Sequence, residues 1–157
     1  MVIMAKCLHP MPSFITVLRF HPQWQMKPEK DAYGQEIWAY LNGEMVNGEI
    51  VERDDGFIDI SGEPAVYFAE YKDWSENDKK SIKLVKGRVL DIGCGAGRIS
   101  LYLQKKDYDV TGIDNSPYAI KTCKKRGLQK ARVMSIDEVN KFKPNSFVLA
   151  LCTTIFF

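Results

Sequence analysis

Residues 88–98 read RVLDIGCGAGR and are the most informative stretch of this 157-residue chain. Val89, Leu90 and Ile92 form a short apolar run that is typical of a buried strand, and a helical pattern begins at Arg98. Between them lies a glycine-rich turn, where the backbone can bend tightly and a ligand can approach without meeting a Cβ atom. The stretch therefore predicts a strand, a ligand-binding loop and a helix.

The sequence after this turn alternates between helical and strand patterns. One helix is expected over residues 98–106, and another begins with Ser116 as its cap and Pro117 in its first turn and ends at Gly127. Strands are expected over residues 88–92, 108–113, 131–135 and 147–152. This alternation predicts an α/β domain with a parallel sheet, right-handed crossovers and flanking helices.

Three carboxylates follow three successive predicted strands. Asp91 ends the first strand, Asp114 ends the second about 20 residues beyond the glycine turn, and Asp137 follows the third. Because the C-terminal ends of parallel strands form the edge where ligands bind, we expect these three side chains to converge. A carboxylate at the position of Asp114 can accept hydrogen bonds from both hydroxyls of a ribose.

The glycines of the turn have a G-x-G-x-G spacing from Gly93 to Gly97, one residue tighter than the G-x-G-x-x-G of dinucleotide sites. The longer spacing accompanies a pyrophosphate that rests on a helix N-terminus. The tighter turn instead favours a ligand without phosphate, packed closely against the loop. A nicotinamide- or flavin-dependent oxidoreductase is therefore the less favoured alternative.

These residues resemble the class I S-adenosylmethionine-dependent methyltransferases, over about residues 65–147 and most closely from Val89 to Arg126. The resemblance implies a Rossmann-like fold, S-adenosyl-L-methionine as the cofactor and methyl transfer as the reaction. It also implies that Tyr71, in the helical region before the first strand, closes over the cofactor. Contacts with the methionine part of the cofactor are assigned to Asp91, Gly93, Cys94, Gly95 and Gly97.

By the same resemblance, residues after the second and third strands are expected to bind the adenosine half of the cofactor. Asp114 would bind the ribose hydroxyls, and Asn115 would lie next to the adenine. Asp137 would accept from the adenine amino group, with Ile136 and Glu138 flanking the ring. An acidic residue after a strand is often a helix cap, which leaves a structural alternative for Asp137.

The patterns divide the chain into three parts. Residues 1–25 combine apolar residues with prolines and are predicted to be a poorly structured extension. Residues 26–86 are predicted to be a helical N-terminal region, in which helices flank an acidic, glycine-containing loop at 43–64 with a short extended piece at 57–60. Residues 87–157 are predicted to be a partial Rossmann-like domain that binds S-adenosylmethionine.

The composition is that of an ordinary globular protein, with 45% hydrophobic residues and a net charge of +2. This balance gives no electrostatic reason to expect nucleic acid or a membrane surface as a partner. Widely spaced cysteines argue against a disulfide framework and favour the reducing cytoplasm, and Cys94 is expected to present its backbone rather than act as a nucleophile. Because Cys7, His9 and His21 match no zinc spacing, no metal site is predicted.

The resemblance also bears on the end of the chain, because members of the family usually carry more strands than the four predicted here. The C-terminal strands and the segment that faces the methyl acceptor are therefore expected to be missing. Residues 147–152 are apolar on both faces, so this fourth strand would be an edge open to self-association. Catalytic residues and the acceptor stay unidentified, with a small molecule slightly favoured; the alternative function is a truncated, non-catalytic fragment that binds the cofactor.

Overall fold

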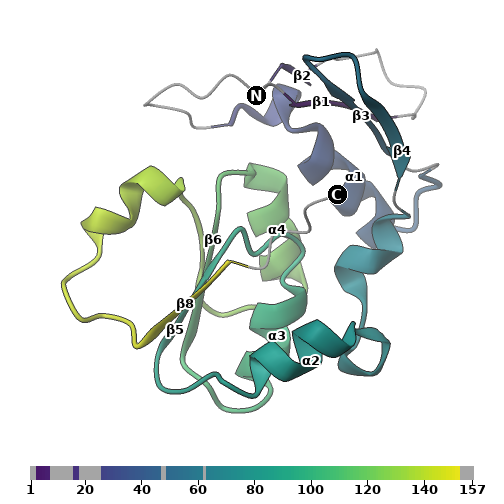
Figure 1. Cartoon of the computed structure of the whole chain (residues 1–157). Coiled ribbons are helices and arrows are strands. Elements are labelled where there is room, and N and C mark those ends of the chain that lie inside the picture. The colour runs from purple at the N-terminus through teal and green to yellow at the C-terminus, as the bar shows by residue number, and fades with distance from the viewer. Residues whose placement is uncertain (1–2, 8–15, 18–25, 47–48, 62, 153–157) are drawn as a thin grey trace.

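The computed structural model describes residues 3–7, 16–17, 26–46, 49–61 and 63–152. Figure 1 shows two sheets with helix α1 (Ala32–Leu41) between them. The larger unit is a parallel sheet covered by helices, and the smaller is an antiparallel sheet on the far side of α1. The candidate site belongs to the larger unit and to the surface of α1 that packs against it.

The parallel sheet consists of β5 (Val89–Ile92), β6 (Val110–Asp114), β7 (Ala131–Val133) and β8 (Leu149–Cys152), in the order β7-β6-β5-β8. All neighbouring pairs are parallel. Asp91 lies beside Gly112 in the register, so Asp91 and Asp114 both lie toward the C-terminal edge of the sheet. The predicted α/β, Rossmann-like fold with four parallel strands and flanking helices is confirmed.

Helices α3 (Arg98–Gln104) and α4 (Pro117–Lys125) lie on one side of this sheet, and the 3-10 helix η4 (Ile136–Lys141) lies on the other (Figure 1). The predicted start of α4 is confirmed, because the Ser116 hydroxyl accepts from the N–H of Ala119 at 2.9 Å. The deepest part of the core lies between these helices and the strands. Its almost fully buried apolar side chains are Val89, Leu103, Ile113, Ile120 and Cys123.

The N-terminal helical region contains α1 and α2 (Glu76–Ile82), together with the 3-10 helices η1 (Pro28–Lys30), η2 (Pro64–Phe68) and η3 (Tyr71–Asp73). Ser75 caps α2 as predicted, accepting from the N–H of Asp78 at 3.1 Å. Helix α1 packs along α4, where the Lys121 ammonium lies 3.9 Å from the centre of the Trp38 ring. These contacts hold α1 close to the edge of the parallel sheet where the two acids lie.

The antiparallel sheet differs from the expectation of an acidic loop and an unstructured extension. It pairs β1 (Ile3–Cys7), β2 (Thr16–Val17), β3 (Glu49–Arg53) and β4 (Ile58–Ser61) in the order β2-β1-β3-β4. Strands β3 and β4 form a hairpin in which the Arg53 N–H donates to the Phe57 carbonyl at 2.9 Å. The acidic side chains and glycines obscured the strand pattern, and the rest of residues 1–25 lies outside the described residues.

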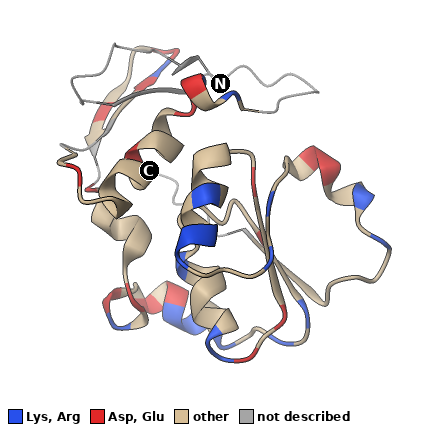
Figure 2. Cartoon of the chain, turned by 180° about the vertical axis from the view of Figure 1, so that it is seen from behind, with Lys and Arg blue, Asp and Glu red and all other residues tan. Residues whose placement is uncertain are grey.

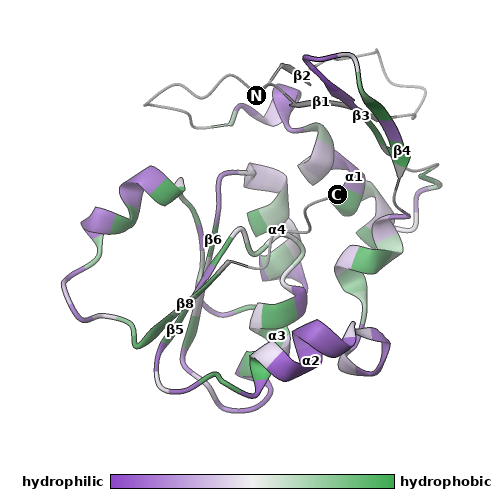
Figure 3. Cartoon of the chain, viewed as in Figure 1, coloured by the Kyte–Doolittle hydropathy of each residue, from purple (hydrophilic) through white to green (hydrophobic). Residues whose placement is uncertain are grey.

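Charge and hydropathy separate the two units. Residues 43–64 have a single basic residue, Arg53, against the acids Glu44, Glu49, Glu52, Asp54, Asp55, Asp59 and Glu63. By contrast, Figure 2 shows Lys and Arg gathered along α4. In Figure 3 the strands of the parallel sheet are mostly hydrophobic, whereas the antiparallel hairpin mixes hydrophobic and hydrophilic residues. In agreement with this mixture, none of residues 50–60 in the hairpin is buried.

Candidate functional site

Asp91 is a fully buried acid near the end of β5, with 0% of its surface exposed. Its Oδ2 accepts from the Ser100 hydroxyl at 2.6 Å, whereas its Oδ1 has no hydrogen-bond donor among the described residues. Burial raises the pKa of Asp91 from 3.8 to about 6, although the hydrogen bond from Ser100 opposes this effect. A buried carboxylate oxygen without a donor is costly, and a cationic or hydrogen-bonding ligand group would relieve that cost.

The glycine loop, residues 93–97, is fixed by its own N–H groups. Those of residues 93 and 94 donate to the Ile113 carbonyl at 2.9 and 3.0 Å, and that of Gly97 donates to the Cys94 carbonyl at 2.8 Å. The N–H of Gly95 donates to Asp114 Oδ2 at 2.9 Å. Because these groups are engaged within the protein, they do not form an anion cradle. The loop instead presents bare backbone to a ligand.

Asp114 ends β6 and supports the loop from the next strand. Its Oδ2 accepts from Gly95 and its Oδ1 accepts from the N–H of Ser116, both at 2.9 Å. A carboxylate has about four acceptor sites, so Asp114 retains acceptor capacity beyond its backbone donors. Burial raises the pKa of Asp114, while backbone hydrogen bonds from Ser116, Gly95 and Asn115 lower it. The residue thus combines a structural role with remaining capacity for a ligand.

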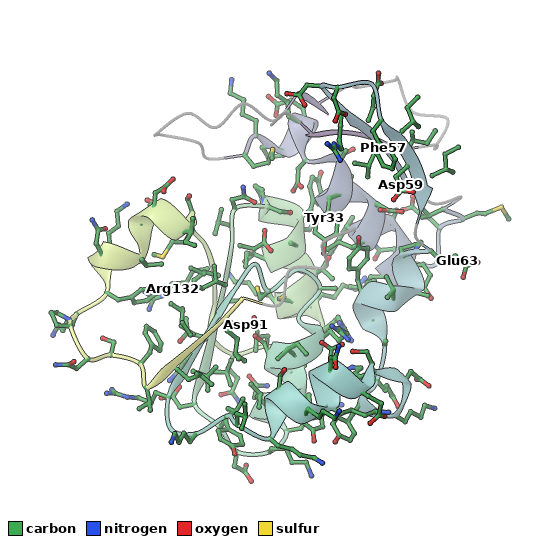
Figure 4. All side chains as sticks on the ribbon, in the orientation of Figure 1. Tyr33, Phe57, Asp59, Glu63, Asp91 and Arg132 are labelled. Carbon is green, nitrogen blue, oxygen red and sulfur yellow. The ribbon has the colours of Figure 1, made fainter. Side chains whose placement is uncertain are left out.

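Tyr33 connects α1 with the glycine loop. Gly95 has a φ of 53°, and a Cβ atom placed on it would lie 2.5 Å from the Tyr33 hydroxyl oxygen. Burial, and then the charge of Asp114, raises the pKa of Tyr33 well above its usual value, so the hydroxyl keeps its proton. Figure 4 shows Tyr33 on the side of α1 toward the parallel sheet, with Phe57 and Asp59 on the other side. A neutral hydroxyl therefore lies against the bare backbone of the loop.

Comparison with known proteins identifies this arrangement. Residues 90–157 match the model of a family described as a methyltransferase domain. The structure also resembles that of an S-adenosylmethionine-dependent methyltransferase from Bacteroides fragilis in complex with S-adenosyl-L-homocysteine, with a TM-score of 0.65 and 25% sequence identity. The parallel-sheet domain is a class I S-adenosylmethionine-dependent methyltransferase domain. The family expected from the glycine turn is thereby confirmed.

Curated relatives of the methyltransferase domain include two ubiquinone biosynthesis O-methyltransferases. The protein from Xanthomonas euvesicatoria pv. vesicatoria is 32% identical over 76 residues, and that from Xylella fastidiosa is 33% identical over 78 residues. These matches cover 45% and 46% of this chain and 32% of each relative. The match to the B. fragilis structure covers 70% of this chain and 45% of the other. The chain thus spans about a third of the length of these curated relatives.

Tyr71, expected to close over the cofactor of the methyltransferase domain, lies in η3. Its ring stacks on Tyr102 of α3 with a centroid distance of 4.8 Å and meets Trp74 edge-on at 5.4 Å. Tyr71 therefore packs on a hydrophobic cluster around Trp74, whereas Tyr33 is the tyrosine that lies on the loop. Gly34 is a sequence signal that α1 packs closely on another element, but it does not single out Tyr33.

The residues expected near adenine lie around η4 and after β6. Asn115 is exposed beside Asp114, and Ile136 is 54% exposed. Asp137 is exposed, and Glu138 forms a capping box with Ser135. The helix-cap interaction weighed as an alternative for Asp137 is thus present at this helix, with Glu138 as its reciprocal partner. The adenine-binding roles of these residues stay predictions.

Cys94 packs against Cys123 of α4 beneath the loop, with 3.9 Å between the two sulfur atoms. Both thiols are buried, and the Cys123 thiol donates to the Gly95 carbonyl at 3.0 Å. The hydrogen bond to Cys123 and burial raise the pKa of Cys94 well above its usual value. A protonated, buried thiol is a poor nucleophile, which agrees with the prediction that Cys94 presents its backbone.

Among the His, Cys, Asp and Glu side chains of the described residues, no group of three or more is arranged to hold a metal ion. Within the same residues, every helix is too short or too polar to cross a lipid bilayer.

Proposed function

We propose that this chain binds S-adenosyl-L-methionine at the glycine loop and presents its methyl group to an acceptor. The observation that carries the proposal is Asp91, whose Oδ1 is buried without a donor at the ligand edge of the sheet. The methionine part of the cofactor carries an ammonium group, which would supply both a positive charge and hydrogen-bond donors. Family membership and the S-adenosyl-L-homocysteine complex of the B. fragilis protein support the same ligand.

The engaged N–H groups of the loop distinguish this ligand from a dinucleotide. A pyrophosphate requires free backbone donors at a helix N-terminus. Here the N–H groups of residues 93, 94, 95 and 97 already have partners within the protein. A nucleoside without phosphates needs only close approach to the loop beside the Tyr33 hydroxyl, together with the acceptor capacity of Asp114. The geometry therefore supports adenosine attached to an amino acid better than it supports NAD.

The described residues would bind and orient the cofactor, and methyl transfer would require little more from them. When bound, the cofactor supplies an electrophilic methyl group on a sulfonium with a good leaving group. Asp91 would hold the amino group of the methionine part, and Asp114 would hold the ribose. The Tyr33 hydroxyl, which lies against Gly95, would also contact the bound ligand. Fixing the ligand at both ends directs the methyl group toward an acceptor, which is catalysis by proximity and orientation.

Isothermal titration calorimetry tests the cofactor proposal directly. S-adenosylmethionine and S-adenosylhomocysteine should bind at a single site, and NAD should bind much more weakly. Equal or tighter binding of NAD would mean that the ligand assignment is wrong. A release of protons on binding near pH 6, measured by repeating the titration in buffers of different ionisation enthalpy, would connect the binding to Asp91.

The acceptor is a separate part of the proposal, and we infer a small molecule. Two relatives are O-methyltransferases of ubiquinone biosynthesis, although each match covers only a third of the relative. The near-neutral charge balance of this chain also gives no basic surface excess for nucleic acid. Incubation with radiolabelled cofactor and fractionated cell extract distinguishes a small-molecule acceptor from a protein or RNA acceptor. Label in the small-molecule fraction is expected, label in protein or RNA would contradict it, and binding without any transfer would favour a non-catalytic cofactor-binding role.

Self-association through β8 is proposed from its position in the sheet. Among the described strands β8 is an edge of the parallel sheet, and its sequence Leu-Ala-Leu-Cys carries no charge. An uncharged edge strand is open to pairing with another chain. Sedimentation velocity should show concentration-dependent dimers that are reduced by Ala150→Lys, since Ala150 is exposed. The same change at exposed Ile60 of β4 is the control, and an equal effect of both would contradict the role of β8.

A further inference from the structure

The Asp31 side chain joins the N-termini of two helices that are far apart in the sequence. Its Oδ1 accepts from the N–H of Gly34 at 2.9 Å and so caps α1. Its Oδ2 accepts from the Ser116 hydroxyl at 2.7 Å and from the N–H of Tyr118 at 3.0 Å, at the start of α4. Asp31 is only 2% exposed. One buried carboxylate therefore binds both helix starts, where a negative charge is favoured by both helix dipoles.

These hydrogen bonds continue into the candidate site. Ser116, which donates to Asp31 through its hydroxyl, also donates through its N–H to Asp114 Oδ1 at 2.9 Å. Asp114 in turn accepts from the N–H of Gly95 in the glycine loop. A continuous path of hydrogen bonds thus runs from the start of α1 to the loop. The path ends at the N–H of Gly95, and the Tyr33 hydroxyl of α1 lies against the backbone of the same residue.

Gly34 provides an independent sign that this junction is closely fitted. A Cβ atom on Gly34 would lie 2.3 Å from Asp31 Oδ2 and 2.3 Å from the Ser116 hydroxyl oxygen. Gly34 lies inside α1, where glycine weakens a helix relative to alanine. Gly34, although it disfavours the helix, thus lies at a position where a side chain would separate Asp31 from Ser116. Helix propensity alone does not explain it, whereas close docking of α1 on α4 does.

We propose that Asp31, with Gly34, is a positioning device that docks α1 on α4 so that Tyr33 lies against the glycine loop. Affinity for the cofactor then depends on the attachment of α1. This step rests on the proposed function only for the identity of the ligand. An ordinary helix cap needs a single acceptor for one helix, and Ser75 performs that task for α2. Asp31 differs because its second oxygen reaches the other helix and, through Ser116, the site.

Calorimetry with S-adenosylhomocysteine tests the proposal in four variants. Asp31→Ala and Gly34→Ala should each weaken binding about tenfold or more, although Gly34→Ala should favour α1 by helix propensity alone. Ser75→Ala, which removes a cap that serves α2 alone, is the matched control and should leave the affinity unchanged. Tyr33→Phe should weaken binding in the intact protein but have little further effect in the Asp31→Ala background, because contacting residues are not additive.

Hydrogen exchange of the ligand-free protein provides a second readout. Asp31→Ala and Gly34→Ala should speed exchange of the Gly95 N–H as well as of α1, whereas Ser75→Ala should change α2 alone. If Asp31→Ala leaves both the loop exchange and the affinity as in Ser75→Ala, the residue is only a cap and the proposal is wrong. If the intact chain fails to bind S-adenosylhomocysteine while the exchange coupling is present, the proposed function fails and the positioning role stands.

Discussion

Strand β6 of the parallel sheet and strand β4 of the antiparallel sheet differ strongly in how deeply their residues are buried. All five residues of β6 are buried, and Ile113 is 0% exposed. In β4 of the antiparallel sheet, Ile58 and Ile60 are 57% and 77% exposed. The parallel sheet is a rigid support whose C-terminal edge can hold acids in fixed positions. None of residues 50–60 in the antiparallel hairpin is buried, so changes in this hairpin should affect ligand binding little.

The largest contrast is expected between two glycines with positive φ. Gly95→Val should abolish S-adenosylhomocysteine binding, because a branched side chain at a φ of 53° would collide with Tyr33. Gly56→Val, at a φ of 84° in the β3–β4 turn, meets no atom within 4 Å and should only lower stability. Calorimetry with circular dichroism separates the two outcomes. If Gly95→Val still bound S-adenosylhomocysteine normally, the ligand would not bind at the glycine loop.

A smaller effect is expected from the buried charge of Asp91. Its folded pKa of about 6 lies above the unfolded value of 3.8, so its contribution to stability is present below about pH 4 and lost as pH rises through 6. The shift corresponds to about 3 kcal/mol. The melting temperature of Asp91→Asn should therefore rise relative to that of the natural protein as the pH increases from 4 to 7.

Ligand affinity should change with pH in the opposite direction, because the ionised carboxylate is the form that binds an ammonium group. S-adenosylhomocysteine should bind the natural protein more weakly as pH falls below about 6, whereas Asp91→Asn should bind weakly at every pH. Calorimetry from pH 5 to 8 measures this difference. Parallel pH profiles for both proteins would show that Asp91 does not contact the ligand.

Asp114→Ala should weaken cofactor binding by about 1.5–3 kcal/mol, the usual range for hydrogen bonds to a charged group. Substitution of Lys105, which is exposed at the end of α3, should have almost no effect. Because Asp114 also accepts from Gly95 and Ser116, Asp114→Asn is a useful companion that retains one acceptor oxygen. Equal losses for Asp114→Ala and Lys105→Ala would contradict the ribose assignment.

The smallest predicted effect compares one isoleucine from each sheet. Ile113→Val, in the fully buried strand β6, should lower the free energy of unfolding by about 1 kcal/mol. Ile60→Val, in exposed β4, should stay within about 0.5 kcal/mol of the natural protein. Urea denaturation measures both. A cost at Ile60 as large as that at Ile113 would mean that the antiparallel sheet has a tighter core than its exposure indicates.

The predictable parts of the molecule are those fixed by neighbours in the sequence. The strand before Gly93, the cap at Ser116 and the acid at Asp114 are local signals, and each is where it was expected. Strands β1 and β3 have no such local signal, because Cys7 pairs with Glu49 and the pairing forms only in the folded chain. Acidic residues between them also resemble a loop.

The position of Tyr33 against the glycine loop could not be predicted from the sequence for a related reason. The helical pattern around Ile37 predicts a helix but not the element on which that helix docks. Docking is decided by Asp31 and Ser116, which are 85 positions apart in the chain. Tyr71 had the same residue type and a similar helical context, but its ring packs on Tyr102. A single sequence cannot distinguish these two tyrosines without the tertiary contacts.

The junction at Asp31 also has a consequence for synthesis on the ribosome. Residues 31–34 leave the exit tunnel well before Ser116 and Tyr118, so nascent α1 has no α4 on which to dock. Helix α1 has 10 residues, and isolated helices shorter than about 12–15 residues are marginal in water. Its aromatic side chains therefore stay exposed until translation has passed α4. The final docking of α1 through Asp31 therefore has to wait until Ser116 and Tyr118 have been synthesised.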